Sequence, residues 1–164
     1  MVMTAGSPQV LEIVDFIRTE YLRQLGVVNE YELLRHGFEA EMLATTIEQE
    51  TTMTDMLGFG NDSGRDRPKA ALVASTIGGT VTVVAFASNN KGGAKTLLAR
   101  LLDRSEHNSE CVAVEVHETN ERAALFLEQS GFNVTSTIHL SETLGNTLRY
   151  EIELPVERLR LIEN

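Results

Sequence analysis

The chain has 164 residues, 42% of them apolar, so one domain with its own core is expected. Its 14 basic and 24 acidic residues give a formal net charge of −10, which argues against nucleic acid as the main partner and favours a basic or amine-bearing one. The first residues do not resemble a leader peptide, and no apolar run approaches the roughly 18 residues of a membrane span. With one cysteine, we expect a cytoplasmic protein that does not enter a membrane.

Three helical patterns occupy the first third of the chain. Apolar residues recur at three- and four-residue steps from 10 to 25 and predict a helix that ends near Gly26. A second, short helix is expected over 30–35. A third apolar pattern begins at Phe38 and runs toward Leu57, which predicts a longer helix.

A loop and a β-hairpin are expected next. The segment 58–68 has three glycines, a proline and mostly polar residues, which predict a surface loop. The runs 70–76 and 80–88 are rich in β-forming residues, and the Gly78-Gly79 pair between them is typical of a hairpin. The second run is more apolar than strict alternation would give, so we expect it to be central in its sheet.

A glycine turn and a helix follow this strand, in the sequence N-N-K-G-G-A-K-T-L-L-A-R-L-L. Gly92 and Gly93 allow a tight turn, and the helix after it has an apolar face made of Leu97, Leu98, Leu101 and Leu102. The first amides of a helix are unpaired and its dipole is positive there, so the arrangement predicts an anion-binding cradle suited to phosphate.

The last third alternates between strands and one helix. Val112, Val114 and Val116 fall on one face of a strand over 111–117, with Glu115 and His117 on the other. A helix is expected after Asn120, ending at Gly131. Two further strands are predicted over 133–140 and 147–154.

Two of these motifs carry a family resemblance. The pattern V-E-V-x-x-x-N-x-x-A-x-x-F-L-x-x-x-G-F, over 114–132, resembles the acetyl-coenzyme-A-binding core of GCN5-related N-acetyltransferases (GNAT), most closely the branch that acetylates protein amino termini. The segment 89–94 resembles their pyrophosphate loop, with Asn89 in place of the usual Gln or Arg. The resemblance implies an α/β (α+β) fold with a central mixed sheet of five strands and helices on both sides. Strands 80–88 and 111–117 would run parallel and splay apart to admit the pantetheine arm.

A second likeness competes for the glycine turn. The K-G-G-x-G-K-T loop of partition-type ATPases resembles K-G-G-A-K-T, but position 94 is Ala where that loop needs Gly, and position 89 is Asn where it needs another Gly. The seventy or so residues that follow lack an apolar strand ending in a magnesium-binding Asp. The nucleotide-hydrolase reading is therefore disfavoured.

The GNAT resemblance implies transfer of an acetyl group from acetyl-CoA to an amine of a small molecule or a protein. By the same resemblance, amides near Phe86–Ser88 would polarise the thioester carbonyl, and amides of Lys91–Lys95 would bind the pyrophosphate. The residues expected to bind acetyl-CoA are Phe86, Ala87, Ser88, Asn89, Asn90, Lys91, Gly92, Gly93, Ala94, Lys95 and Asn120.

The resemblance supplies a candidate catalytic base but not the usual catalytic acid. Glu115 occupies the position of a glutamate base, although a solvent-facing strand residue would have the same pattern. The Tyr that usually acts as acid is replaced by Leu127, which leaves Tyr150 and His117, with Tyr21 and Tyr31, as candidate donors.

These departures keep open a second class of function. It is a catalytically inactive GNAT-like module with a structural or partner-binding role, of the kind that some virus-encoded proteins resemble. A homo-oligomer or larger assembly is compatible with either class.

Overall fold

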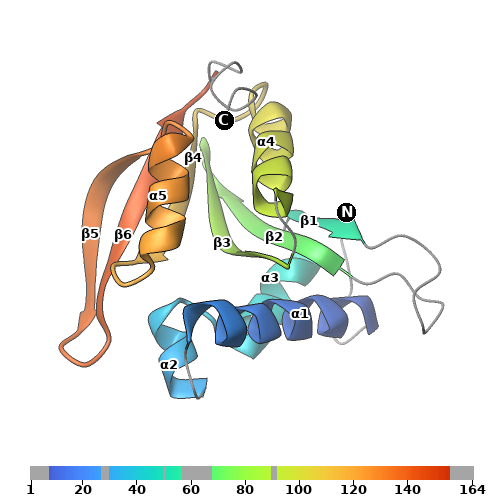
Figure 1. Cartoon of the computed structure of the whole chain (residues 1–164). Coiled ribbons are helices and arrows are strands. Elements are labelled where there is room, and N and C mark those ends of the chain that lie inside the picture. Colours follow the sequence, from blue (N-terminus) through green and yellow to red (C-terminus); the bar gives the residue numbers. More distant parts are fainter. Residues whose placement is uncertain (1–7, 27–29, 50, 57–67, 90–91, 156–164) are drawn as a thin grey trace.

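The computed structural model describes residues 8–26, 30–49, 51–56, 68–89 and 92–155 (Figure 1). The helices are α1 (Pro8–Leu25), α2 (Glu30–Arg35), α3 (Ala40–Gln49), α4 (Gly93–Ser105) and α5 (Glu121–Gln129). The strands are β1 (Thr51–Met56), β2 (Pro68–Ile77), β3 (Thr80–Ser88), β4 (Cys111–His117), β5 (Asn133–Ser141) and β6 (Gly145–Glu153). Within these ranges, no helix combines the length and apolar character that crossing a membrane requires.

All six strands form one mixed sheet in the order β1-β2-β3-β4-β6-β5. Neighbours pair antiparallel except β3 and β4, which are parallel and are joined through α4. A parallel pair needs a crossover of this kind, whereas the antiparallel pairs β2–β3 and β5–β6 need only short turns. The predicted mixed sheet and the parallel pair are confirmed.

Helices cover both faces of the sheet (Figure 1). On one face, α4 and α5 pack through leucines against residues of β2, β3, β4 and β6. On the other, α1, α2 and α3 pack against β2 and β3. The buried face of α4 consists of the predicted leucines, Leu97, Leu98, Leu101 and Leu102.

A β-bulge in β3 reverses which of its side chains face each layer. Val83 pairs with Ala74 and Ala85 with Val73, so Val84 is the extra residue. Val81 and Val83 belong to the core under α4 and α5, whereas Ala85 and Ala87 belong to the core under α1. The bulge and the burial of both faces explain why this strand does not alternate simply in sequence.

One predicted element is wrong. The third helical pattern was expected to continue toward Leu57, but α3 ends at Gln49 and residues 51–56 form β1 at the edge of the sheet, antiparallel to β2. Threonine is β-branched and favours a strand, and three of these six residues are threonines. The sheet therefore has one strand more than predicted.

The expected loop 58–68 falls on residues outside those described, apart from Pro68, which begins β2. Proline is tolerated as the first residue of a strand because its missing N–H is not needed there.

Candidate functional site

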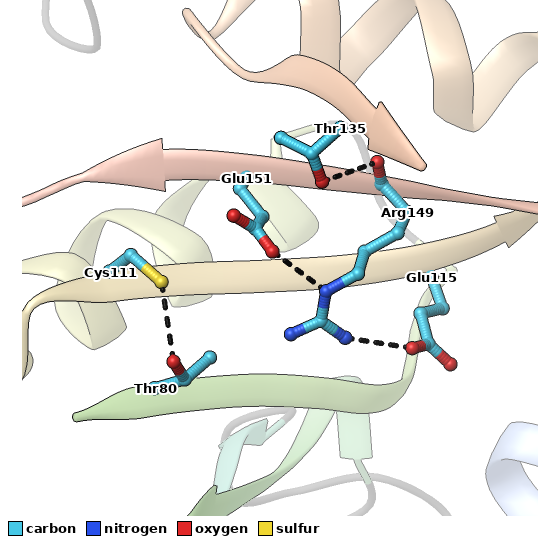
Figure 2. Close-up of polar contacts among 6 residues, drawn as sticks. All are labelled: Thr80, Cys111, Glu115, Thr135, Arg149 and Glu151. Atoms are coloured by element: carbon cyan, nitrogen blue, oxygen red, sulfur yellow. Dashed lines mark hydrogen bonds and ion pairs between the residues drawn. The ribbon is translucent and has the colours of Figure 1, made fainter. Parts of the chain in front are cut away.

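The paired part of β3 and β4 is short. The register couples Thr80–Val83 with Cys111–Val114, and at the start of this pairing Thr80 Oγ1 lies 3.5 Å from Cys111 Sγ (Figure 2). Beyond it the strands separate, because the bulge bends β3 while β4 continues along β6. The predicted splay is confirmed, and it leaves backbone polar groups on one edge of β3 without a strand partner.

A cleft of about 390 Å³ opens where the two strands separate. It is lined by seven of the residues predicted to bind acetyl-CoA: Phe86, Ala87, Ser88, Gly92, Ala94, Lys95 and Asn120. Gly93 is buried at the start of α4, and Asn89 is exposed outside the cleft lining. Asn90 and Lys91 lie outside the described residues.

The start of α4 faces this cleft. Gly92 is the N-cap residue with φ of 86°, a left-handed conformation that glycine adopts without strain, and no side chain caps the helix. The Gly92 carbonyl accepts a hydrogen bond of 3.0 Å from the Thr96 N–H, the first of the helix. The three preceding amides, Gly93 to Lys95, have no partner within the helix, so the turn fits an anionic group such as a phosphate.

Asn120 lies on the opposite side of the cleft, at the start of α5. Its Oδ1 accepts a 3.2 Å hydrogen bond from the Ala123 N–H, which makes it the N-cap of the helix. A capping Asn is fixed in orientation, because the backbone amide holds its oxygen. The Asn120 side chain therefore has a structural role and also borders the cleft.

Helix α1 forms a wall of the cleft that contacts the free edge of β3. The Phe86 N–H donates to Tyr21 Oη at 3.4 Å, and Gln24 Nε2 donates to the Ser88 carbonyl at 2.5 Å. Gln24 Nε2 also donates to Glu20 Oε1 at 2.8 Å. Glu20, only 6% exposed, lines the cleft with Tyr21 and Gln24.

Sequence reasoning named Tyr21 only as one of several donors and missed Glu20 and Gln24. A signal for them exists. The apolar positions Val10, Val14 and Ile17 define the buried stripe of α1, and residues three and seven positions after Ile17 continue that stripe. Polar side chains at 20 and 24 are therefore expected on the packed side of the helix, where a buried polar group is a candidate for function. Glu20 is buried there, whereas Gln24 is exposed at the end of the stripe.

Tyr21 remains protonated at neutral pH. Burial raises the pKa of its phenol to about 12, and the hydrogen bond from the Phe86 backbone offsets only part of that increase. Because the Phe86 N–H donates to Tyr21 Oη, the phenolic proton stays available for another acceptor.

Glu115, on β4, faces the cleft and forms an ion pair. Arg149 Nη1 lies 2.8 Å from Glu115 Oε2, and Arg149 Nε lies 2.7 Å from Glu151 Oε2, so one guanidinium joins two carboxylates (Figure 2). The hydrogen bond to Glu151, followed by that to Glu115, raises the pKa of Arg149. Of these two carboxylates, only Glu115 lines the cleft.

His117 lines the cleft but both of its ring nitrogens are engaged. The Thr119 backbone N–H, which can only donate, lies 3.1 Å from Nδ1, and the Leu144 carbonyl, which can only accept, lies 2.5 Å from Nε2. The proton is therefore on Nε2, which donates to Leu144, and Nδ1 accepts. His117 thus ties the end of β4 to the β5–β6 turn, and these contacts leave it no nitrogen for proton transfer in the cleft.

Tyr150 lies away from the cleft. It is 1% exposed in the core under α4 and α5, and burial raises the pKa of its phenol, as does Glu128. Leu127, at the position of the usual acid, is fully buried in the same core. Neither lines the cleft.

A second cleft of about 280 Å³ adjoins the first. Both clefts are lined by His36, Val83, Val84, Glu115 and His117. Glu115 therefore stands at the junction of two cavities. No group of three or more His, Cys, Asp or Glu suited to a metal ion occurs in the part of the chain that the structure describes.

Comparison with known proteins gives structural neighbours only: no family model matches the sequence, and no curated protein is significantly similar to it. The ribosomal-protein-S18-alanine N-acetyltransferase of Escherichia coli has 15% identity and a TM-score of 0.61, over 96% of this chain and 95% of that chain. A chain of the NatC complex bound to Gag peptide and CoA has 15% identity and a TM-score of 0.64, over 91% and 92%. The Ard1 protein of Thermoplasma volcanium has 20% identity and a TM-score of 0.50, over 56% of this chain and 66% of that chain, just under two thirds of its length. The chain has the fold of the GCN5-related N-acetyltransferases, the GNAT superfamily.

Proposed function

We propose that this protein is an N-acetyltransferase that moves an acetyl group from acetyl-CoA to an amine of a small molecule or a protein. The observation that carries the proposal is the position of the splay between β3 and β4, which opens directly onto the uncapped start of α4. Two of the solved structures with this fold are bound to CoA, one of them also to a peptide. Acetyl-CoA would supply the acetyl group as an activated thioester.

The chain's own groups would hold the cofactor by its backbone. The amides of Gly93, Ala94 and Lys95 would bind the pyrophosphate, and the free edge of β3 around Phe86 and Ser88 would align the pantetheine arm. Backbone donors of this edge would polarise the thioester carbonyl, where charge develops during attack.

Glu115 would accept the proton that the amine loses, directly or through a water molecule. The amine nitrogen forms its bond to the carbonyl carbon as the carbon–sulfur bond breaks, and the departing thiolate needs a proton. Tyr21 is the proposed donor. Among the described residues it is the tyrosine that lines the cleft, and because its oxygen accepts the hydrogen bond from the Phe86 N–H, its own proton is available to the thiolate.

The replacement Tyr21→Phe is expected to lower kcat about tenfold without changing the affinity for CoA. This is below the roughly 10²–10⁴-fold of typical acid–base groups, since a thiolate leaves without full protonation. Steady-state kinetics and calorimetry measure the two quantities. Tyr31→Phe is the matched control, because Tyr31 is 53% exposed on α2 and lines neither cleft. An unchanged kcat in the Tyr21 variant would mean that water, and not Tyr21, protonates the departing thiolate.

The proposed function is tested by incubating the pure protein with acetyl-CoA and a panel of amines and peptides while free thiol is followed. Thiol release above the blank that depends on the amine supports the transferase. CoA binding in calorimetry without any turnover, or no binding at all, would replace it by the alternative, a GNAT-like partner-binding module.

A further inference from the structure

The second cleft has mainly apolar walls supplied by four elements. Its aliphatic side chains come from α2, α3, β3 and β5, namely Leu34, Met42, Leu43, Val84, Ile138 and Leu140. Most of them are exposed to a degree unusual for large apolar residues, with Met42 at 70% and Leu34 at 42%. A continuous apolar surface of this kind, beside a carboxylate, indicates a ligand that is apolar next to a charged group.

Only one acidic side chain of the second cleft is available to a cation. The cleft contains two carboxylates, those of Glu39 and Glu115. Glu39 accepts hydrogen bonds from the backbone N–H groups of Glu41 at 3.2 Å and Met42 at 2.8 Å, which cap the start of α3. Glu115 stands at the junction with the first cleft, and Arg149 holds it through Oε2 alone, so its other oxygen, Oε1, is the atom that an ammonium would meet.

The remaining walls carry one charged group, the Arg35 guanidinium, and no further carboxylate. Burial, followed by the electrostatic effects of the neighbouring His117 and Arg35, lowers the pKa of His36 to about 4, so this ring is neutral at neutral pH. Arg35 donates through Nη2 to the Thr143 carbonyl at 3.1 Å, which ties α2 to the β5–β6 turn. A second cation on the acceptor would therefore be desolvated beside the Arg35 guanidinium and without a carboxylate partner, which is costly.

The same wall has two polar atoms without partners. Arg35 Nε and His36 Nδ1 are buried and make no hydrogen bond within the described residues. A buried polar atom without a partner is unfavourable, and a ligand carbonyl or amide could satisfy these two atoms after a small side-chain shift. An alkylamine has neither group, whereas a peptide carries both directly after its first α-carbon, the carbonyl first and then the amide N–H.

We propose that the acceptor is the α-amino group of a peptide or protein whose first residue has a large aliphatic side chain. The ammonium would lie at Glu115, the first side chain between Met42, Ile138 and Leu140, and the first carbonyl beside Arg35. This inference rests on the proposed acetyl transfer and names its substrate class. It excludes polyamines and lysine side chains as preferred acceptors, because the former bring a second charge and the latter have no branch beside the amine to fill the cleft.

The test compares acceptors at fixed acetyl-CoA in the thiol-release assay. Tripeptides that begin with Leu, Met, Ser or Asp, an amino-terminally blocked peptide with one Lys, spermidine and isobutylamine form the panel. We expect kcat/KM for the Leu and Met peptides to exceed that for the Ser and Asp peptides about 10- to 100-fold, the range that one apolar pocket can supply. Isobutylamine is expected to be poorer than the Leu peptide by at least tenfold.

Two substitutions connect the preference to the cleft. Met42→Glu and Ile138→Glu each add a carboxylate to its wall and are expected to lower kcat/KM for the Leu peptide about tenfold or more, and to raise it for a peptide beginning with Lys. Ile77→Glu is the matched control, because Ile77 is 79% exposed in β2 and lines neither cleft. Circular dichroism verifies that each variant is folded.

The possible failures are distinguishable. Turnover of the Ser or Asp peptides as fast as the Leu peptide overturns the inference while the transferase stands. Equal turnover of isobutylamine overturns the peptide assignment, and preferred turnover of spermidine or the blocked Lys peptide overturns the substrate class. Absence of thiol release with every acceptor overturns the proposed function itself.

Discussion

Replacing Glu115 by Gln is expected to lower kcat by about 10²–10⁴-fold, the range of a positioned general base, with little change in CoA affinity. Gln has the same shape and its amide oxygen can still accept from Arg149, so the ion pair is the only other contact altered. Because the Glu115 side chain is 38% exposed, losing that pair changes stability by about 1 kcal/mol or less. Single-turnover rates and thermal unfolding measure the two effects.

Glu151→Gln is the matched control for this prediction. Glu151 binds the same guanidinium, through Arg149 Nε at 2.7 Å, but it does not line the cleft. If Glu115 acts as the base, the Glu151 variant keeps most of its kcat. An equal loss in both variants would mean that the two carboxylates act only by holding Arg149. No loss of kcat in either variant would mean that water, and not Glu115, accepts the proton of the amine.

Much of the sheet and its functional edge could be predicted because the signals are local. The alternation over 111–117, the β-forming apolar run over 80–88, the glycine turn at 92 and 93 and the leucine face of α4 each lie within about a dozen residues. A helix that joins two neighbouring strands of one sheet then favours a parallel pair, because parallel strands need a crossover connection. The position of the glycine turn beside the cleft follows from this topology.

The remainder depends on contacts between distant segments. Neither the Val84 bulge nor the contact of Tyr21 with Phe86, 65 residues apart, has a local signature. For His117, sequence spacing placed the ring on the Glu115 face of β4 but could not reveal that Thr119 and Leu144 engage both its nitrogens. The predicted end of α3 was wrong because the apolar spacing over 51–56 is compatible with a helix. These residues form a strand because they pair with β2, a contact that the local sequence does not reveal.

Gly92→Pro is expected to reduce the affinity for CoA about 10²-fold or more. Gly92 has φ of 86°, whereas proline is restricted to about −65°, so the turn that aims the amides of Gly93 to Lys95 cannot form. Hydrogen bonds to charged groups contribute roughly 1.5–3 kcal/mol each, and losing two of them gives an effect of this size. Isothermal titration with CoA measures it.

Two further variants separate loss of the turn from general destabilisation. Gly26→Ala introduces similar strain at the end of α1, where φ is 68° and nothing lies within 4 Å of the added carbon, so it should lower the unfolding temperature without affecting CoA binding. Lys95→Ala removes a side chain that lines the cleft but keeps its backbone amide, and is expected to weaken binding far less than Gly92→Pro. If Lys95→Ala and Gly92→Pro weaken binding equally, the side-chain charge rather than the backbone cradle holds the phosphate. If Gly92→Pro binds like the unmodified protein, the turn is only a helix start.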